Sequence, residues 1–337
     1  MPYEVFLAMR YCESAVLDAM MPYLTEHYGN ASSNTHSFGH IARNAVEEAR
    51  QKVAELIGTN GVDEIIFTSG STESDNLAVK GVAHLKKSGH IITIPTEHKA
   101  ILDPCKRLQK EGFTVSFAKL DKYGIVDLDH LKRLITDDTI LISIQAANSE
   151  IGTLQPLDEI GQIAADNNIT FHTDAVQILG KGQVNVQKSN IQLLSISGHK
   201  MYGPKGVGAL YVQKGLTLKP LLDGGGHERG MRSGTLNVPG IVGLGKAAEI
   251  AKREFVTESE RLLALRNRLA DGIEKRLDFV QLNGHPTKRL PNNLNYSFAY
   301  VEGESLILSC RDVALSSGSA CTSTSLQSSY VLKAIGV

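Results

Sequence analysis

Residues 63–120 read DEIIFTSGSTESDNLAVKGVAHLKKSGHIITIPTEHKAILDPCKRLQKEGFTVSFAKL, and this stretch decides the fold class. Three short runs rich in β-branched residues, at 63–70, 90–97 and 113–120, are separated by segments with the spacing of amphipathic helices. A regular alternation of strands and helices is typical of parallel strands joined by crossover helices. The alternation continues from 139 to 198, so we expect an α/β protein with a mostly parallel central sheet flanked by helices.

A long charged helical pattern follows at 241–277. We expect this helix to connect a large domain, residues 14–250, to a smaller C-terminal α+β domain, residues 251–337, that residues 1–13 help to form. The chain has no internal repeat and no low-complexity segment.

The composition is that of an ordinary globular protein. Of the 337 residues, 42% are hydrophobic and 21% are charged, and the formal net charge is −1. A balanced charge gives no reason to expect a nucleic-acid or anionic-membrane partner, and no apolar run is long enough to span a bilayer. We therefore expect a cytoplasmic protein with neither kind of partner.

The four cysteines, at 12, 105, 310 and 321, form no CxxC pair and no cluster with histidine at the spacing of metal ligands. The sequence thus predicts neither a disulfide framework nor a metal site. A functional cysteine would act as a thiol, and Cys321 is the candidate because the small residues of SSGSACTS suit a thiol that must move between two positions. The alternative is an inert cysteine buried in a glycine-serine turn.

Polar groups follow the ends of the predicted strands. After the first strand, Ser69–Thr72 lead into a helix with Glu73 in its first turn. Free N–H groups and the helix dipole make such a turn favourable for a phosphate. The plainer interpretation is an N-cap followed by an acidic residue.

Two further strand ends carry ionisable groups. Asp174 follows the apolar run ITFHT, and a carboxylate buried there needs a cationic partner such as a protonated pyridine nitrogen. A helix N-cap is the alternative role for Asp174. His98, in PTEHKA, lies where its ring could stack on a flat ligand or move a proton near neutral pH, unless its role is only structural.

The last strand end reads SISGHKMYGPKG, residues 195–206. A lysine that is desolvated or close to other cations can bond covalently to a carbonyl carbon. Lys200 is therefore a candidate nucleophile, with Ser197 and His199 placed to hold a phosphate, whereas the alternative is a solvated turn lysine. Together the strand ends supply the contacts that an aldehyde cofactor with a phosphate needs.

The chain resembles the cysteine desulfurases of the NifS/IscS type, in the fold-type I, class V aminotransferase group of pyridoxal-phosphate enzymes. The resemblance runs from about residue 13 onward and rests on TSGSTESDNLA, TEHKA, DAVQ, SGHKMYGPKG, GGGHERGMRSGT, EGESL and SSGSACTS. It implies the cofactor pyridoxal 5'-phosphate, the substrate L-cysteine and a homodimer. The implied reaction gives L-alanine and a persulfide on Cys321. That sulfur would pass to an acceptor or iron–sulfur scaffold protein for cluster assembly or thio-modification, and Cys321 would transiently ligate a cluster with such a partner.

The resemblance also implies a role for individual residues. Lys200 would hold the cofactor covalently, Asp174 would pair with the ring nitrogen, and Gln177 would bond the phenolic oxygen. His98 would stack on the ring and assist proton transfer. The residues implied to hold the phosphate are Ser71, Thr72, Ser197 and His199, with Thr235 reaching the phosphate of the neighbouring subunit.

Three features depart from the family pattern. VFLAMRYCES replaces an Asp-Asn-Ala-Thr-Thr-Pro-like turn, and Ser149 stands where a cofactor-contacting asparagine is usual, although its hydroxyl can still donate. We expect the small domain to be truncated at its C-terminus, without an arginine that grips the substrate carboxylate, and turnover to be poor for that reason. The alternative functions are a selenocysteine lyase, another class V enzyme, or a catalytically weak cofactor-binding scaffold.

Overall fold

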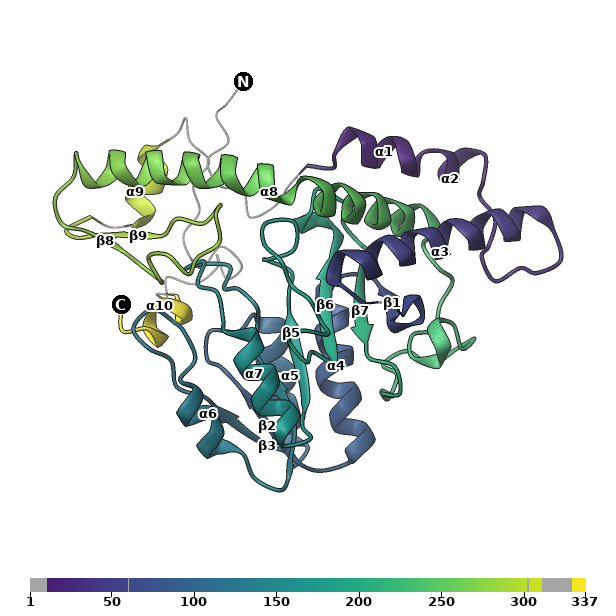
Figure 1. The fold of residues 1–337 in the computed structure, drawn as a ribbon, viewed down its shortest axis with the longest axis horizontal. Coiled ribbons are helices and arrows are strands. Elements are labelled where there is room, and N and C mark those ends of the chain that lie inside the picture. Colours follow the sequence, from purple (N-terminus) through teal and green to yellow (C-terminus); the bar gives the residue numbers. More distant parts are fainter. Residues whose placement is uncertain (1–10, 60, 302, 311–328) are drawn as a thin grey trace.

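A computed structural model describes residues 11–59, 61–301, 303–310 and 329–337. Its centre is a seven-stranded sheet (Figure 1) with the strand order β1-β7-β6-β5-β4-β2-β3. In chain order the strands are β1 Ile65–Thr68, β2 His90–Thr93, β3 Thr114–Phe117, β4 Thr139–Ser143, β5 Thr170–Asp174, β6 Leu193–Ser197 and β7 Gly208–Val212.

The strands β1 to β6 all point in the same direction. The pairs β6–β5, β5–β4, β4–β2 and β2–β3 are parallel, whereas β7 runs antiparallel to both β6 and β1. The carboxyl ends of β1 to β6 therefore meet at one edge, which is where open α/β sheets bind their ligands. The mostly parallel sheet predicted from the sequence is confirmed.

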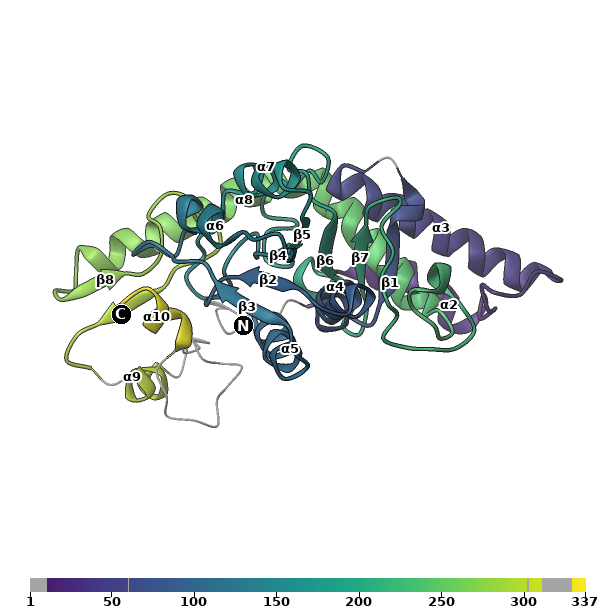
Figure 2. The same ribbon diagram turned by 90° about the horizontal axis from the view of Figure 1, so that it is seen from below.

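Helices cover both faces of the sheet (Figure 2). α4 and α5 pack on one face, while α3, α6, α7 and α8 pack on the other. The helices are α1 Ser14–Met20, α2 Pro22–Thr25, α3 Ser37–Ile57, α4 Ser71–Lys86, α5 Lys99–Lys110, α6 Leu128–Leu134, α7 Leu157–Asp166, α8 Val238–Glu274, α9 Gly303–Ser309 and α10 Tyr330–Ala334.

Two apolar layers join these helices to the sheet. Successive residues of a strand point to opposite faces, so Leu141 packs toward α4 and α5 while Ile142 packs toward the other layer. Cys105 on α5 is fully buried in the first layer. Burial, with a smaller effect from the charge of Glu97, raises the pKa of its thiol to about 12, so Cys105 packs as a small apolar residue.

The helical pattern at 241–277 forms α8, a helix of 37 residues. It packs on α3 and extends to a two-stranded antiparallel sheet, β8 Val280–Leu282 with β9 Tyr296–Phe298 (Figure 1). Near the chain end, α10 returns to the large sheet, where the hydroxyl of Tyr330 donates to the carbonyl of Glu97 at 2.7 Å. Within the described residues, no helix has the length and apolar character that crossing a membrane requires.

Candidate functional site

The polar residues predicted at strand ends lie at one edge of the sheet. Thr68 ends β1, Asp174 ends β5 and Ser197 ends β6, and these strands point the same way. His98 lies between β2 and α5 at the same edge. The topology thus brings together residues that are far apart in the sequence.

Asp174 is a half-buried carboxylate at this edge. Burial raises its pKa, and three influences oppose that rise: the N–H of Val176, which donates to Oδ1 at 2.9 Å, and the charges of His98 and Lys200. Lys200 and the ring of His98 therefore lie close enough to influence the carboxylate. The described segment between β5 and β6 holds turns rather than a helix, so the alternative of a helix N-cap is wrong for Asp174.

His98 has a structural role as well as a place near Asp174. It is the N-cap of α5, and its Nδ1 accepts a hydrogen bond from the N–H of Ala100 at 3.1 Å. With Nδ1 used as an acceptor, a neutral ring carries its proton on Nε2. The exposed ring can therefore offer that proton to a ligand.

The turn after β1 is shaped to receive an anion. Gly70, at φ 145°, is the N-cap of α4, and no side chain caps the helix. The first N–H groups of a helix have no partner within it, so those of Ser71 and Thr72 suit an anionic ligand. A Cβ on Gly208 would lie 2.7 Å from the Cα of Gly70 and 2.5 Å from the carbonyl oxygen of Ile196. Only glycine lets β7 approach the turn this closely.

Ser197 and His199 form a hydrogen-bonded pair beside Lys200. Ser197 is almost completely buried, and its Oγ lies 3.0 Å from Nδ1 of His199. Burial lowers the pKa of His199, and the charges of Lys200 and Lys205 lower it further. A neutral ring that accepts at Nδ1 can donate from Nε2, which suits a phosphate oxygen.

Lys200 lines a cavity of about 280 Å³. The cavity lies between residues near the start of α1 and the middle of α8, and its wall includes Glu13, Arg253 and Arg261. Its size is close to the lower end of ligand pockets, about 300 Å³. Of the described residues proposed for the site, Lys200 alone lines this cavity.

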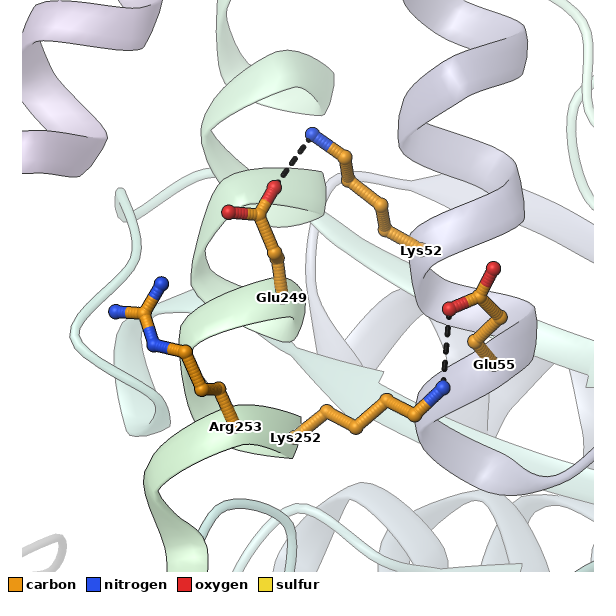
Figure 3. A pocket seen from close by; sticks show the side chains of 5 residues that line it. All are labelled: Lys52, Glu55, Glu249, Lys252 and Arg253. Carbon is orange, nitrogen blue, oxygen red and sulfur yellow. Dashed lines mark hydrogen bonds and ion pairs between the residues drawn. The ribbon is translucent and has the colours of Figure 1, made fainter.

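A second cavity, of about 290 Å³, lies on the surface between α3 and α8 (Figure 3). Lys52 pairs with Glu249 at 2.7 Å, and Lys252 pairs with Glu55 at 3.0 Å, so two ion pairs cross from one helix to the other. The charges within each pair compensate one another. The cavity is therefore part of the packing contact between α3 and α8.

A set of buried polar residues beside Asp174 was not predicted from the sequence. His172 lies two residues earlier on β5, and its Nδ1 and Nε2 lie 2.9 and 3.0 Å from the hydroxyls of Ser143 and Ser195. Oδ1 of Asp75, on α4, lies 3.7 Å from the same Nε2. Burial lowers the pKa of His172 to about 3 and raises that of Asp75, which the charge of Asp174 raises further. Burial thus favours the uncharged form of both groups.

Glu97 is a further buried carboxyl of this region. Its Oε1 accepts from the N–H of Gln145, and burial raises its pKa well above the ordinary value.

Alternation in TFHTD places His172 and Asp174 on the same face of β5, and this signal was available in the sequence. The contacts with Asp75 and Glu97 depend on how α4 and the loop before α5 pack, which no local pattern indicates.

The other predicted site residues are less constrained. Gln177 is half-buried, Thr72 and Thr235 are exposed, and Ser149 is exposed after the buried Asn148. The amide of Asn148 bonds the carbonyl of Thr96 and two backbone N–H groups. Cys321 lies outside the described residues.

The donors at this edge fit an aromatic aldehyde that carries a phosphate. Asp174 is a half-buried carboxylate that suits a cationic partner, Lys200 is an amine close to it, and the turn at Gly70 has uncapped N–H groups beside the close approach of Gly208. Each part of pyridoxal phosphate thus has a matching group in this chain.

The chain is similar to known enzymes along nearly its whole length. The family model described as aminotransferase class-V matches residues 11–335. Cysteine desulfurase IscS of Anaeromyxobacter sp. (strain K) is 55% identical over 326 residues, which cover 96% of this chain and 80% of that protein. Cysteine desulfurase IscS of Rickettsia rickettsii (strain Iowa) is 52% identical over 339 residues, with coverages of 99% and 82%.

Solved structures show the same relationship. A structure described as a NifS-like protein superposes with a TM-score of 0.92 at 39% identity, and the match covers 100% of this chain and 90% of that one. A structure described as SspA in complex with cysteine superposes with a TM-score of 0.88 at 36% identity, with coverages of 98% and 93%.

Proposed function

The chain belongs to the aminotransferase class-V family and is a pyridoxal-phosphate-dependent cysteine desulfurase, and we propose that Lys200, Asp174 and His98 carry its chemistry. The observation that best supports these roles is their proximity at one sheet edge, since His98 and Lys200 both lie close enough to influence the half-buried Asp174. A nucleophile, a proton carrier and an anion for the ring nitrogen thus lie at one sheet edge.

The bound cofactor supplies a ring that withdraws electrons from the substrate carbons. Asp174 would pair with the protonated ring nitrogen, and the charges of His98 and Lys200 partly oppose the rise that burial causes in the pKa of its carboxyl. Lys200 would hold the aldehyde carbon of the bound cofactor and would move a proton at the α-carbon of cysteine. His98 would lie against the ring and would offer its Nε2 proton, while Gln177 would bond the phenolic oxygen.

The phosphate binds at the turn before α4 and beside β6. The residues proposed to hold it are Ser71, Thr72, Ser197 and His199, with Ser149 near the ring and Thr235 reaching the neighbouring subunit. The exposure of Thr235 supports this last contact, because the residue is accessible to a second copy of the chain. We therefore propose a homodimer.

Cys321 is proposed as the sulfur acceptor. Its thiolate attacks the sulfur of L-cysteine and forms a sulfur–sulfur bond, while the carbon–sulfur bond of the substrate breaks. The electron pair of that bond stays with the carbon fragment, which leaves as alanine after protonation. We propose that the persulfide passes to an acceptor protein for iron–sulfur cluster assembly or thio-modification.

We also propose the division of the chain into a large domain, residues 14–250, and a smaller one, residues 251–337. The separate sheets before and after α8 support it. The cytoplasmic location expected from the sequence stays a prediction.

Borohydride reduction of the holoenzyme tests the site, because it fixes the cofactor to the lysine that binds it. Peptide mass spectrometry should find the label on Lys200 in the wild type and in Lys205→Ala, which removes an exposed lysine of the same turn. Lys200→Ala should lose the label and retain weaker binding through the phosphate. Label on any other lysine in the wild type would show that the assignment is wrong.

A further inference from the structure

Glu73 presents an electrostatic problem for the proposed phosphate site. It lies in the first turn of α4, about 5 Å or less along the axis from the N–H groups that would hold the phosphate. Its Oε2 accepts from the N–H of Ser69 at 2.8 Å, which directs the carboxylate back toward the turn. A negative side chain there repels a phosphate that carries nearly two negative charges.

Arg232 compensates that charge from a distant part of the sequence. Its Nε lies 2.9 Å from Oε1 of Glu73, and the exposed fractions of the two side chains are 18% and 14%. Burial alone would raise the pKa of Glu73, but the hydrogen bonds from Arg232 and Ser69 lower it overall. Glu73 is therefore ionised at neutral pH, and Arg232 is its neutralising partner.

A second ion pair fixes the segment that carries Arg232. Arg50 and Glu228 are both buried and form a bidentate pair at 2.8 and 2.9 Å. The same carboxylate accepts from the N–H of Phe67 at 2.7 Å, and Arg50 donates to the carbonyl of Ile65 at 2.6 Å. The segment is thus fastened to the outer edge of β1, the strand that leads into the turn.

The backbone of this segment supports a fixed geometry. Glu228 and Arg229 have φ values of 47° and 57°, which residues other than glycine rarely adopt. Such a conformation persists where surrounding contacts determine it. Glu228 bonds Phe67 before the phosphate turn, and Arg232 bonds Glu73 after it. These contacts therefore hold residues 228–232 against both sides of that turn.

We propose that Arg232 is a positioning residue for the cofactor phosphate: it neutralises Glu73, keeps that carboxylate on the N–H of Ser69, and so leaves the first turn of α4 free to bind the dianion. This inference rests on the phosphate site proposed above. It assigns Arg232 no contact with the cofactor, and its effect is specific to ligands that carry the phosphate.

The test compares two ligands, pyridoxal phosphate and pyridoxal, which has the aldehyde but no phosphate. Dissociation constants are measured by absorbance on apoprotein from each variant. Arg232→Gln leaves Glu73 uncompensated, so it should weaken pyridoxal phosphate about tenfold while changing pyridoxal by less than about threefold. Arg232→Lys, which retains the charge, and the double variant Glu73→Gln/Arg232→Gln should both return to within about threefold of the wild type.

Arg107→Gln is the matched control, because it removes an exposed arginine whose Nε lies 3.0 Å from a carboxylate oxygen of Glu111. It should change neither constant. Equal weakening of both ligands by Arg232→Gln, or no recovery in the double variant, would overturn the inference and leave the trapping of the cofactor on Lys200 unaffected. Cofactor trapped at another lysine of the wild type would overturn both.

Discussion

At the scale of the residue, His172 shows how burial next to the site determines the way in which the stability of the fold changes with acid. Its pKa is about 3 in the folded protein, whereas an unfolded histidine titrates near 6.5. Between these values the unfolded chain binds a proton that the folded chain excludes. The stability that depends on neutral His172 is therefore complete above about pH 6.5 and decreases as the pH falls toward 3.

Replacing His172 should make the free energy of unfolding less sensitive to acid. Between about pH 7.5 and pH 5, neutral His172 accounts for a loss of about 2 kcal/mol in the free energy of unfolding. His172→Gln should be less stable at the higher pH, because it loses bonds to Ser143 and Ser195, yet lose about 2 kcal/mol less on acidification. Urea unfolding at both pH values measures the difference.

The control for this experiment is His40→Gln, which removes an exposed histidine. It should keep the pH dependence of the wild type. The buried carboxyl Glu97 titrates in both proteins, so its effect cancels in the comparison. An undiminished acid loss in His172→Gln would contradict a neutral, buried His172.

At the scale of the element, two glycines differ in what surrounds them. Gly208 lies where two backbone segments approach closely, whereas Gly272 lies in an open position of a helix. A Cβ at Gly208 meets backbone atoms of Gly70 and Ile196, which cannot move aside, whereas at Gly272 in α8 nothing lies within 4 Å. Gly208→Ala should lower the free energy of unfolding by about 1–3 kcal/mol and weaken cofactor binding, since it displaces the turn before α4. Gly272→Ala should raise stability by up to about 1 kcal/mol and leave binding unchanged.

Chemical unfolding and cofactor titration of both variants check this pair. Wild-type cofactor affinity in Gly208→Ala would mean that the packing of β7 does not shape the turn.

The sequence predicted the strands and helices that form this site better than the contacts between residues that are far apart in the chain. Alternating strands and helices fix a parallel sheet, and parallel strands end at one edge, so Asp174, Ser197 and Lys200 could be placed together in advance. Glu73 was recognised as a first-turn residue, but its partner Arg232 comes from a segment more than 150 residues away. Contacts of that kind depend on how loops pack, and no local periodicity encodes them.

At the scale of the whole molecule, the described residues form a large sheet, the long helix α8 and the small sheet of β8 and β9. The ion pairs of Glu228 with Arg50 and of Arg232 with Glu73 fasten the loop before α8 to α3 and α4, while Thr235 just beyond them is exposed. A held loop that ends in an exposed threonine is the arrangement that the proposed contact with a neighbouring cofactor site requires.

The central claim, sulfur transfer from L-cysteine to Cys321, is tested most directly by mass spectrometry of the holoenzyme after exposure to L-cysteine without reductant. One additional sulfur atom should appear on the peptide that contains SSGSACTS. Cys321→Ser should retain the absorbance of the bound cofactor yet gain no sulfur and form little alanine, because a hydroxyl is a far weaker nucleophile than a thiolate. Sulfur on Cys12, Cys105 or Cys310 instead, or wild-type alanine production by Cys321→Ser, would contradict the claim.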